Sequence, residues 1–360
     1  MKILLVSDAW SPQVNGVVRT LTTIVGLLRA RSHRVHTITP DQFWSVPMPS
    51  YPEIRLALTS RRRVAATITG FAPDAVHIAT EGPLGWLARA CCMKRGIPFT
   101  TSFHTRFPDY VAARTGLDPA PVWRVLRRFH IPATAVMVAT PRLAAELASH
   151  GLTRCQPWTR GVDLALFRAD VAAHPAFADL PRPIALHVGR VAVEKNIEAF
   201  LAADWHGSKV VVGDGPALEA LQSRFPGAHF LGSLHGDALA STYAGADVLV
   251  FPSRTDTFGL VMIEALACGT PVAGYPVAGP LDIIGPQGRG ASGTGPPVGA
   301  VDDDLGAAMV NALSARRVDC AKAGALFSWD HSCDQFLAAL AGAQPVPVPE
   351  PLQNPVPQAA

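Results

Sequence analysis

The feature that most constrains the fold is an alternation of short, wholly apolar segments with longer helical ones. Predicted strands lie at residues 2–7, 34–39, 75–80, 98–104 and 134–140, and again at 183–189, 209–214, 229–232, 247–253 and 271–275. Strands that are apolar on both faces and alternate with helices are typical of parallel sheets covered by helices on both sides. The two series predict an α/β protein of two doubly wound, Rossmann-like domains, and 360 residues suit two domains of ordinary size.

The boundary between the two series falls between Gly161 and Leu180, where Gly, Asp and Pro interrupt the pattern. We therefore place an N-terminal domain at residues 1–166 and a C-terminal domain at 167–328. A last helix is predicted over residues 329–343. Residues 344–360 contain six prolines and almost no charge, which predicts an extended, disordered tail.

The composition is typical of a soluble, intracellular protein. Hydrophobic residues make up 49% of the chain and charged residues 16%, which excludes wholesale disorder. The six cysteines show no C-x-x-C spacing, so we expect reduced thiols in a cytosol. No apolar run reaches the roughly 18–20 residues of a membrane span, and the short apolar start predicts a buried strand instead of a signal peptide. These features predict a cytoplasmic location.

The charge is distributed unevenly between the two halves. Residues 1–165 hold 20 Lys and Arg against 9 Asp and Glu, whereas residues 166–360 hold 11 against 19. Two clusters carry much of the basic excess, Arg61–Arg63 and the set Arg124, Arg127 and Arg128, whose spacing places them on one helical face. Such a face is suited to an anionic membrane surface, although an ordinary solvated helix remains an alternative. Nucleic acid is a weaker prediction because no groove-reading motif accompanies the charge.

Candidate ligand-binding residues follow the strands of both halves, since parallel sheets bind ligands beyond the carboxyl ends of their strands. Asn15 and Gly16 open a helix after the first strand, where free N–H groups can meet an anion, but they do not form a dinucleotide fingerprint. Arg190 and Lys195 follow a strand of the second half and suit a diphosphate. The alternative for these two cations is surface pairing with neighbours such as Glu194.

The segment 253–272 combines two carboxylates with the start of a helix. Asp256 lies in the loop, and Glu264 lies eight residues later inside the helix among apolar residues. A buried carboxylate needs hydrogen-bond donors, and sugar hydroxyls would serve, whereas pairing with a local arginine is the alternative. His104 also follows a buried strand on the ligand side, although a lone histidine there is often structural.

The sequence predicts no metal site. The run 302–304 is three aspartates, but a helix follows at once, so the run reads as a helix cap with first-turn carboxylates. No histidine cluster has metal-ligand spacing, and P-loop and serine-nucleophile motifs are missing.

Eight segments form a pattern that is specific as a set. They are PQVNGVVRT (12–20), HIATEGPLG (77–85), SFHTRFPDY (102–110), RGVDLALF (160–167), HVGRVAVEKN (187–196), VVGDGPALEAL (211–221), FLGSLHG (230–236) and the block 247–272. In this order they resemble the glycosyltransferase family 4 enzymes of the GT-B fold, over residues 2 to 340. The VNGVVRT and TEGPLG elements are most similar to the branch that contains sulfoquinovosyl-diacylglycerol synthases and GDP-mannose-dependent alpha-mannosyltransferases.

The resemblance implies two Rossmann-like domains facing across a cleft, with the acceptor on the N-terminal domain and a nucleotide diphosphate sugar on the C-terminal one. It implies that a hexose is transferred with retention of configuration and without a metal ion or other cofactor. The last helix would cross back onto the N-terminal domain. GDP-mannose and UDP-hexoses remain open as donors. A membrane lipid or glycolipid is the expected acceptor, with a soluble glycan as the alternative.

The resemblance also implies roles for individual residues. Arg190 and Lys195 would neutralise the leaving diphosphate, and His104 would lie beside the donor sugar. Glu264 would hold the ribose hydroxyls, and Asp256 those of the donor sugar. The other positions implied to contact the nucleotide sugar are Asn15, Gly16, Gly213, Gly215, Leu234, Phe258, Gly259 and Leu260.

Two features depart from the family pattern. Asp256 stands where the family usually has glutamate, and the glycine-rich stretch 285–300, predicted to be a loose loop, replaces a short strand-like segment. Two other functions share the fold, a UDP-N-acetylglucosamine 2-epimerase and a degenerate scaffold that binds a partner. The presence of His104, Arg190, Lys195 and Glu264 favours the transferase.

Overall fold

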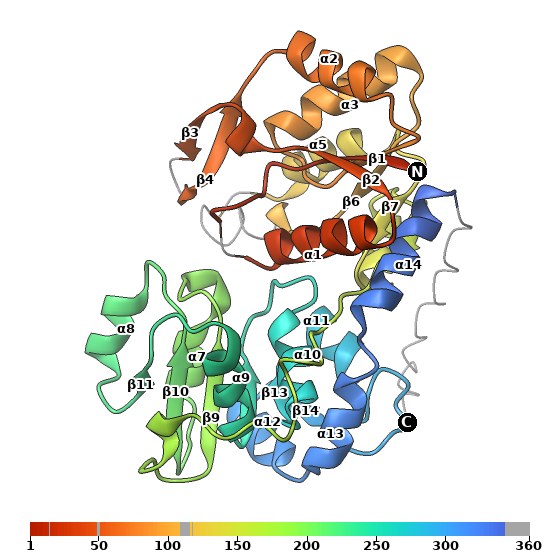
Figure 1. Ribbon diagram of the computed structural model, residues 1–360. Coiled ribbons are helices and arrows are strands. Elements are labelled where there is room, and N and C mark those ends of the chain that lie inside the picture. The colour runs from red at the N-terminus through yellow and green to blue at the C-terminus, as the bar shows by residue number, and fades with distance from the viewer. Residues whose placement is uncertain (14, 49–50, 109–115, 117, 343–360) are drawn as a thin grey trace, which may run out of the picture.

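The computed structural model describes residues 1–13, 15–48, 51–108, 116 and 118–342. The predicted tail, 344–360, and the end of the 102–110 motif lie outside these residues. Within the described chain, two parallel six-stranded sheets each form the centre of a domain, and the two domains lie one above the other in Figure 1. This arrangement confirms the predicted doubly wound α/β fold.

The N-terminal sheet has the strand order β2-β1-β5-β6-β7-β8. Its strands are β1 (Lys2–Val6), β2 (Arg34–Ile38), β5 (Ala75–Ile78), β6 (Thr100–Ser102), β7 (Val136–Val138) and β8 (Cys155–Pro157). The helices that connect them are α1 (Gly16–Ala30), α2 (Arg61–Phe71), α3 (Pro83–Arg95), α5 (Ala120–His130) and α6 (Pro141–Ser149). Helix α1 lies on the side of this domain that is turned toward the other domain (Figure 1).

The C-terminal sheet has the strand order β11-β10-β9-β12-β13-β14. Its strands are β9 (Ile184–Val188), β10 (Ser208–Val212), β11 (His229–Phe230), β12 (Val248–Phe251), β13 (Val272–Gly274) and β14 (Gly299–Val301). Its helices are α7 (Ile197–Ala202), α8 (Leu218–Arg224), α9 (Gly236–Gly245), α10 (Leu260–Ala267), α11 (Ala278–Ile283), α12 (Leu305–Ala312) and α13 (Arg317–Gly324).

Burial on both faces explains why the central strands are almost wholly apolar, with buried His77 and His187 as exceptions. Ile3, Leu4, Leu5 and Val6 of β1 have no exposed surface, and every residue of β9 is buried. Full burial of such a side chain contributes about 1.5–3 kcal/mol. The central strands therefore fix the direction of the loops that follow them, and those loops carry the candidate site.

Four of the described strands were not predicted. Strands β3 (Trp44–Met48) and β4 (Tyr51–Leu58) form an antiparallel hairpin outside the main sheet, and prolines in both obscured the pattern. Strand β8 is only three residues long. Strand β14 corrects the prediction that 285–300 is all loop, because Gly299 and Ala300 pair with Val272 and Ala273 of β13. Position 299 requires glycine, because the Cβ atom of any other residue would lie 2.2 Å from the Val272 carbonyl oxygen.

The last helix, α14 (Trp329–Leu340), packs on the N-terminal domain, where Cys333 and Phe336 join the core cluster of Ile3, Leu5 and Leu21. Arg31, which directly follows α1, also donates to the carboxylates of Asp330 and Asp334 on α14. In Figure 1, α14 runs from the lower domain along the side of the upper one. The chain therefore joins the two domains twice, once before β9 and once at the start of α14.

Candidate active site

The loops that follow the strands of the two sheets meet at the domain interface. Thr257, in the loop before α10, donates from Oγ1 to the carbonyl oxygen of His104 at 2.8 Å. A Cβ atom on Gly16 would lie 3.4 Å from Cδ1 of Leu260, so the start of α1 faces the start of α10. Residues predicted from widely separated segments are thus brought together by the two domains.

Lys195 and Asp256 form an ion pair. Lys195 ends the short 3-10 helix η3 (Val193–Lys195), and its Nζ lies 2.6 Å from Oδ1 and 2.8 Å from Oδ2 of Asp256. Both side chains are largely buried, with exposed fractions of 24% and 14%. Two groups predicted to contact the donor are therefore adjacent, and a bound diphosphate would share Lys195 with Asp256. Arg190 lies half-buried at the start of the same loop.

The predicted glycines of the 211–221 motif are required by packing. Gly213 and Gly215 have φ values of +143° and +155°, which side chains rarely adopt. A Cβ atom would lie 1.8 Å from the carbonyl oxygen of Gly189 and 2.4 Å from that of Val191, respectively. The loop after β10 is thereby held against the loop that carries Arg190. Leu234, half-buried, packs against the core of the same domain.

The start of α10 and the start of α1 differ in how their N–H groups are satisfied. Gly259 precedes α10 with φ +94°, and no side chain caps this helix. Phe258, the residue before Gly259, is buried. Asn15 caps α1 by accepting from the backbone N–H groups of Val17 and Val18, both at 3.0 Å. An anion at this interface would therefore meet the N–H groups at the start of α10, which no side chain caps.

Glu264 is buried, with an exposed fraction of 2%, and both of its oxygens have partners. The Tyr243 hydroxyl donates to Oε2 at 2.8 Å, and Arg19 forms an ion pair with Oε1. The alternative considered from the sequence was a local arginine, but Arg19 is 245 positions away and belongs to the other domain. No local pattern in the sequence indicates this pair or the role of Tyr243.

His104 is held by a second arginine that the sequence did not reveal. Nη2 of Arg160 lies 3.1 Å from Nδ1 of His104, and Ser102 Oγ lies 2.8 Å from Nε2. A guanidinium only donates, so Nδ1 accepts and the imidazole proton is on Nε2. Burial and the charge of Arg160 lower the pKa of His104 well below its usual value, so the ring is neutral. Both ring nitrogens are thus occupied by protein partners, and contact with a donor sugar stays a prediction.

Asp8 explains the glycines of the TEGPLG element. Its carboxylate accepts from the backbone N–H groups of Leu84 at 2.8 Å and Gly85 at 3.2 Å, at the start of α3. A Cβ atom on Gly82 would lie 2.4 Å from Cγ of Asp8, and one on Gly85 would lie 2.0 Å from the Thr80 carbonyl oxygen. This element of the family pattern is therefore structural, since it fixes α3 against the loop that leads to Gly16.

Within the part of the chain that the structure describes, no group of three or more His, Cys, Asp or Glu side chains is arranged to hold a metal ion. None of the described helices has the length and apolar character needed to cross a membrane. At residues 302–304, Asp304 caps α12 by accepting from the N–H groups of Gly306 and Ala307, as predicted.

Comparisons with known proteins identify the class and then the family. Residues 14–166 match the model of Glycosyltransferase Family 4, and residues 182–314 match that of Glycosyl transferases group 1. The sucrose-phosphate synthase of Thermosynechococcus elongatus has the same fold, with a TM-score of 0.70 and 22% identity, over 94% of this chain and 98% of the other. The protein is a glycosyltransferase with the GT-B fold.

Two relatives of known function show which glycosyltransferase family the chain belongs to. The chain is 32% identical over 309 residues to a GDP-mannose-dependent alpha-mannosyltransferase of Mycolicibacterium smegmatis, covering 79% of this chain and 82% of the relative. It is 29% identical over 307 residues to sulfoquinovosyl transferase SQD2 of Arabidopsis thaliana, covering 78% of this chain and 60% of the relative. The chain therefore belongs to glycosyltransferase family 4, as the motifs indicated.

Proposed function

We propose that the protein transfers a hexose, with retention of configuration, from GDP-mannose or a UDP-hexose to a lipid or glycolipid acceptor. The observation that carries the proposal is the contact between the domains beside the Lys195–Asp256 ion pair. Thr257, next to Asp256, binds the His104 carbonyl, Leu260 faces Gly16, and Glu264 pairs with Arg19 of α1. In the reaction, the bond from the sugar C1 to the diphosphate oxygen breaks and a bond from C1 to the acceptor oxygen forms. The acceptor hydroxyl loses its proton, which the departing nucleoside diphosphate takes up.

In this proposal, side chains and backbone N–H groups of the protein take the place of a metal ion. Negative charge grows on the diphosphate as it leaves, and the ammonium of Lys195 with the guanidinium of Arg190 would neutralise that charge. The uncapped start of α10 and the backbone at Gly16 would add N–H donors. GDP-mannose is favoured among the donors because the M. smegmatis relative is a GDP-mannose-dependent alpha-mannosyltransferase.

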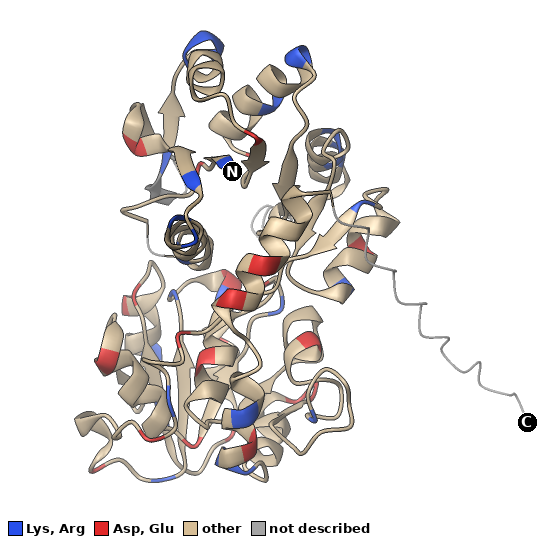
Figure 2. Cartoon of the chain, turned by 45° about the vertical axis from the view of Figure 1, so that its right-hand side comes forward, with Lys and Arg blue, Asp and Glu red and all other residues tan. Residues whose placement is uncertain are grey.

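A membrane acceptor is supported by the surface of the N-terminal domain. Arg61 on α2 donates to the Ala90 carbonyl of α3, and Arg89 on α3 donates to the carbonyls of Phe129 and Arg128 on α5. Helix α3 therefore bridges the two predicted basic clusters. The residues of both clusters, Arg61, Arg62, Arg63, Arg124, Arg127 and Arg128, are exposed. Figure 2 shows this basic colouring on the helices of the upper domain.

Apolar side chains lie beside this basic surface. Val125 and Ile131 are about half-exposed around the arginines of α5, and Trp44 on the hairpin before α2 is 86% exposed. Arginines attract anionic headgroups, and tryptophan is favoured at the membrane interface. We therefore place the protein peripherally on the inner face of the cell membrane, where the basic domain would receive a lipid acceptor.

Binding to anionic vesicles tests this placement. Replacing Arg124, Arg127 and Arg128 together by serine should weaken binding to phosphatidylglycerol vesicles by at least about tenfold, since each cation near an anionic surface contributes about 1 kcal/mol. Vesicle sedimentation at low and high salt measures the effect, and Arg224→Ser on the C-terminal domain is the matched control. Binding that depends neither on anionic lipid nor on salt would remove the membrane placement and favour a soluble glycan acceptor.

A transfer assay tests the proposed reaction. The purified protein is incubated with a membrane lipid extract and labelled GDP-mannose, UDP-glucose, UDP-galactose, UDP-glucuronate or UDP-sulfoquinovose, and lipid products are identified by mass spectrometry. One labelled lipid, formed from one donor, is the expected result. Donor hydrolysis without a lipid product would move the acceptor to soluble glycans. Failure to bind or consume any donor would contradict the proposal.

A further inference from the structure

The environment of Glu264 is built from both domains. Tyr243 on α9 belongs to the same domain as Glu264, whereas Arg19 on α1 belongs to the N-terminal domain. The carboxylate therefore has one partner that is present in the isolated C-terminal domain and one that is present only when the domains meet. A carboxylate can accept about four hydrogen bonds, so these two donors do not use its full acceptor capacity.

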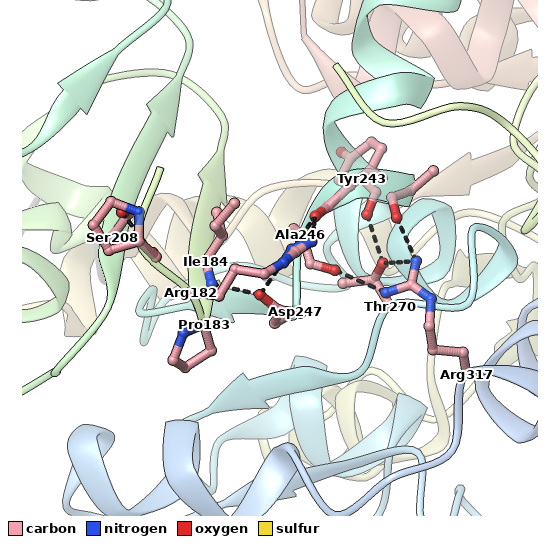
Figure 3. Close-up of polar contacts among 12 residues, drawn as sticks. Arg182, Pro183, Ile184, Ser208, Tyr243, Ala246, Asp247, Thr270 and Arg317 are labelled. Atoms are coloured by element: carbon pink, nitrogen blue, oxygen red, sulfur yellow. Dashed lines mark hydrogen bonds and ion pairs between the residues drawn. The ribbon is translucent and has the colours of Figure 1, made fainter. Parts of the chain in front are cut away.

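The C-terminal domain holds Tyr243 independently of Arg19. Figure 3 shows two arginines around the end of α9, Arg182 from the segment before β9 and Arg317 from α13. Arg182 donates to the Gly245 carbonyl at 2.9 Å, and Arg317 donates to the Ala246 carbonyl at 2.8 Å. Thr270 Oγ1 donates to the carbonyl of Tyr243 at 2.6 Å. Tyr243 is thus held within the domain of Glu264, whereas Arg19 is supplied by the other domain.

The charge state of Glu264 depends on these neighbours. Burial raises the pKa of Glu264 above its ordinary value, while the positive charge of Arg19 and the hydrogen bond from Tyr243 lower it. Burial also raises the pKa of Tyr243 and brings that of Cys268, which directly follows α10, to about 12, so both stay protonated. Arg317 on α13 lies beyond Cys268, whose carbonyl it binds. Of the described cations, Arg19 is therefore the one in contact with the carboxylate.

We propose that Arg19 is a positioning residue that keeps Glu264 ionised and oriented to accept hydrogen bonds from the ribose hydroxyls of the donor. This inference rests on the proposed function, because it takes Glu264 as the ribose ligand. A protonated carboxyl group would lose acceptor capacity and carry a hydrogen in place of a lone pair. Because Arg19 comes from the N-terminal domain, contact between the domains would complete the ribose site.

Arg19 can be replaced without opening a hole in the core. Its side chain is 38% exposed and borders an open pocket of about 330 Å³, lined also by Thr23, Asp163 and Trp329. Shortening the Arg19 side chain to alanine therefore enlarges this open pocket. The folded state of the variant is expected to persist, and a binding defect can be attributed to Glu264.

The test is a comparison of ribose with dideoxyribose. Wild-type protein and Arg19→Ala are titrated calorimetrically with GDP, UDP and their 2′,3′-dideoxy analogues at pH 6.5 and pH 8.5. The wild-type protein should bind its preferred ribonucleotide at least about tenfold more tightly than the dideoxy analogue at both pH values. Arg19→Ala should lose most of this preference at pH 6.5. It should regain part of it at pH 8.5, because a carboxyl group with a raised pKa becomes ionised as the pH rises.

Three further variants separate charge from structure. Arg19→Lys keeps the cation and should retain most of the preference at pH 6.5. Arg29→Ala removes a cation from the last turn of the same helix and should behave as wild type. Thr257→Val removes another interdomain hydrogen bond without touching Glu264, so it should weaken nucleotide binding equally at both pH values.

The outcomes distinguish this inference from the proposed function. If Arg19→Ala keeps the full preference for the ribonucleotide at pH 6.5, or binds it more tightly than wild type, Arg19 does not prepare Glu264 and the inference is overturned. If the wild-type protein itself shows no preference for the ribonucleotide, the assignment of Glu264 to the ribose fails instead.

Discussion

Replacing Lys195 with alanine is expected to lower the turnover number by about 100-fold or more. The ammonium of Lys195, in the same loop after β9 as Arg190, is held by Asp256 from the loop after β12. The proposed reaction develops negative charge on the departing diphosphate, and removing one preorganised cation or donor from such a site typically costs about 10²–10³ in rate. The KM for the donor should change less than the turnover number if Lys195 acts mainly in the transition state.

The control variants for Lys195 address the loss of its partner. Alanine at this position removes the ion pair with Asp256, so the melting temperature is measured together with the kinetics. Lys195→Arg keeps the charge and should recover part of the rate, and Lys322→Ala on the exposed surface of α13 should have no effect. Unchanged turnover in a folded Lys195→Ala protein would show that the phosphates lie elsewhere.

Replacing Gly213 with alanine is expected to destabilise the C-terminal domain by about 3 kcal/mol or more. The new Cβ atom would lie 1.8 Å from the Gly189 carbonyl oxygen, which belongs to the backbone and has no room to move aside. The φ of +143° adds conformational strain for any residue with a side chain. Steric overpacking and backbone strain each cost about 1–3 kcal/mol. A fall of about 10 °C in the melting temperature is the corresponding measurement.

Gly227 provides the matched comparison for Gly213. It lies in the turn before β11 of the same domain, and a Cβ atom there would meet nothing within 4 Å. Gly227→Ala should therefore leave the melting temperature within about 1–2 °C of wild type, as is usual for surface positions. A Gly213→Ala protein as stable as wild type, yet defective in nucleotide binding, would assign this glycine to the ligand and not to packing.

The fold was predictable because the strands at the centre of a doubly wound sheet are buried on both faces. Ile3–Val6 is a continuous apolar run for that reason, Ile184–Val188 is apolar except for the buried His187, and both strands were predicted. Strands at the edges or outside the sheets carry weaker patterns. Prolines interrupt the hairpin β3–β4, and glycines obscure β14, so neither could be distinguished from a loop by composition alone.

The candidate site was predictable only in part. Asp256, Lys195 and Gly16 lie in loops whose position follows from the strands before them, so a local sequence pattern was enough to select them. The partners that set the chemistry of the buried groups are distant in the sequence. Arg19 meets Glu264 across the domain interface, and Arg160 meets His104 across 56 positions, and no periodicity or spacing indicates either contact.

A crystal structure of the protein with GDP or UDP tests the account most directly. The central claim is that the C-terminal domain holds the nucleotide diphosphate at the interface with the N-terminal domain. The predicted complex has the ribose hydroxyls within hydrogen-bond distance of Glu264 and the diphosphate against Lys195, Arg190 and the backbone of Gly16. A nucleotide bound away from Glu264 and Lys195, or one that contacts neither cation of the loop after β9, would contradict the account.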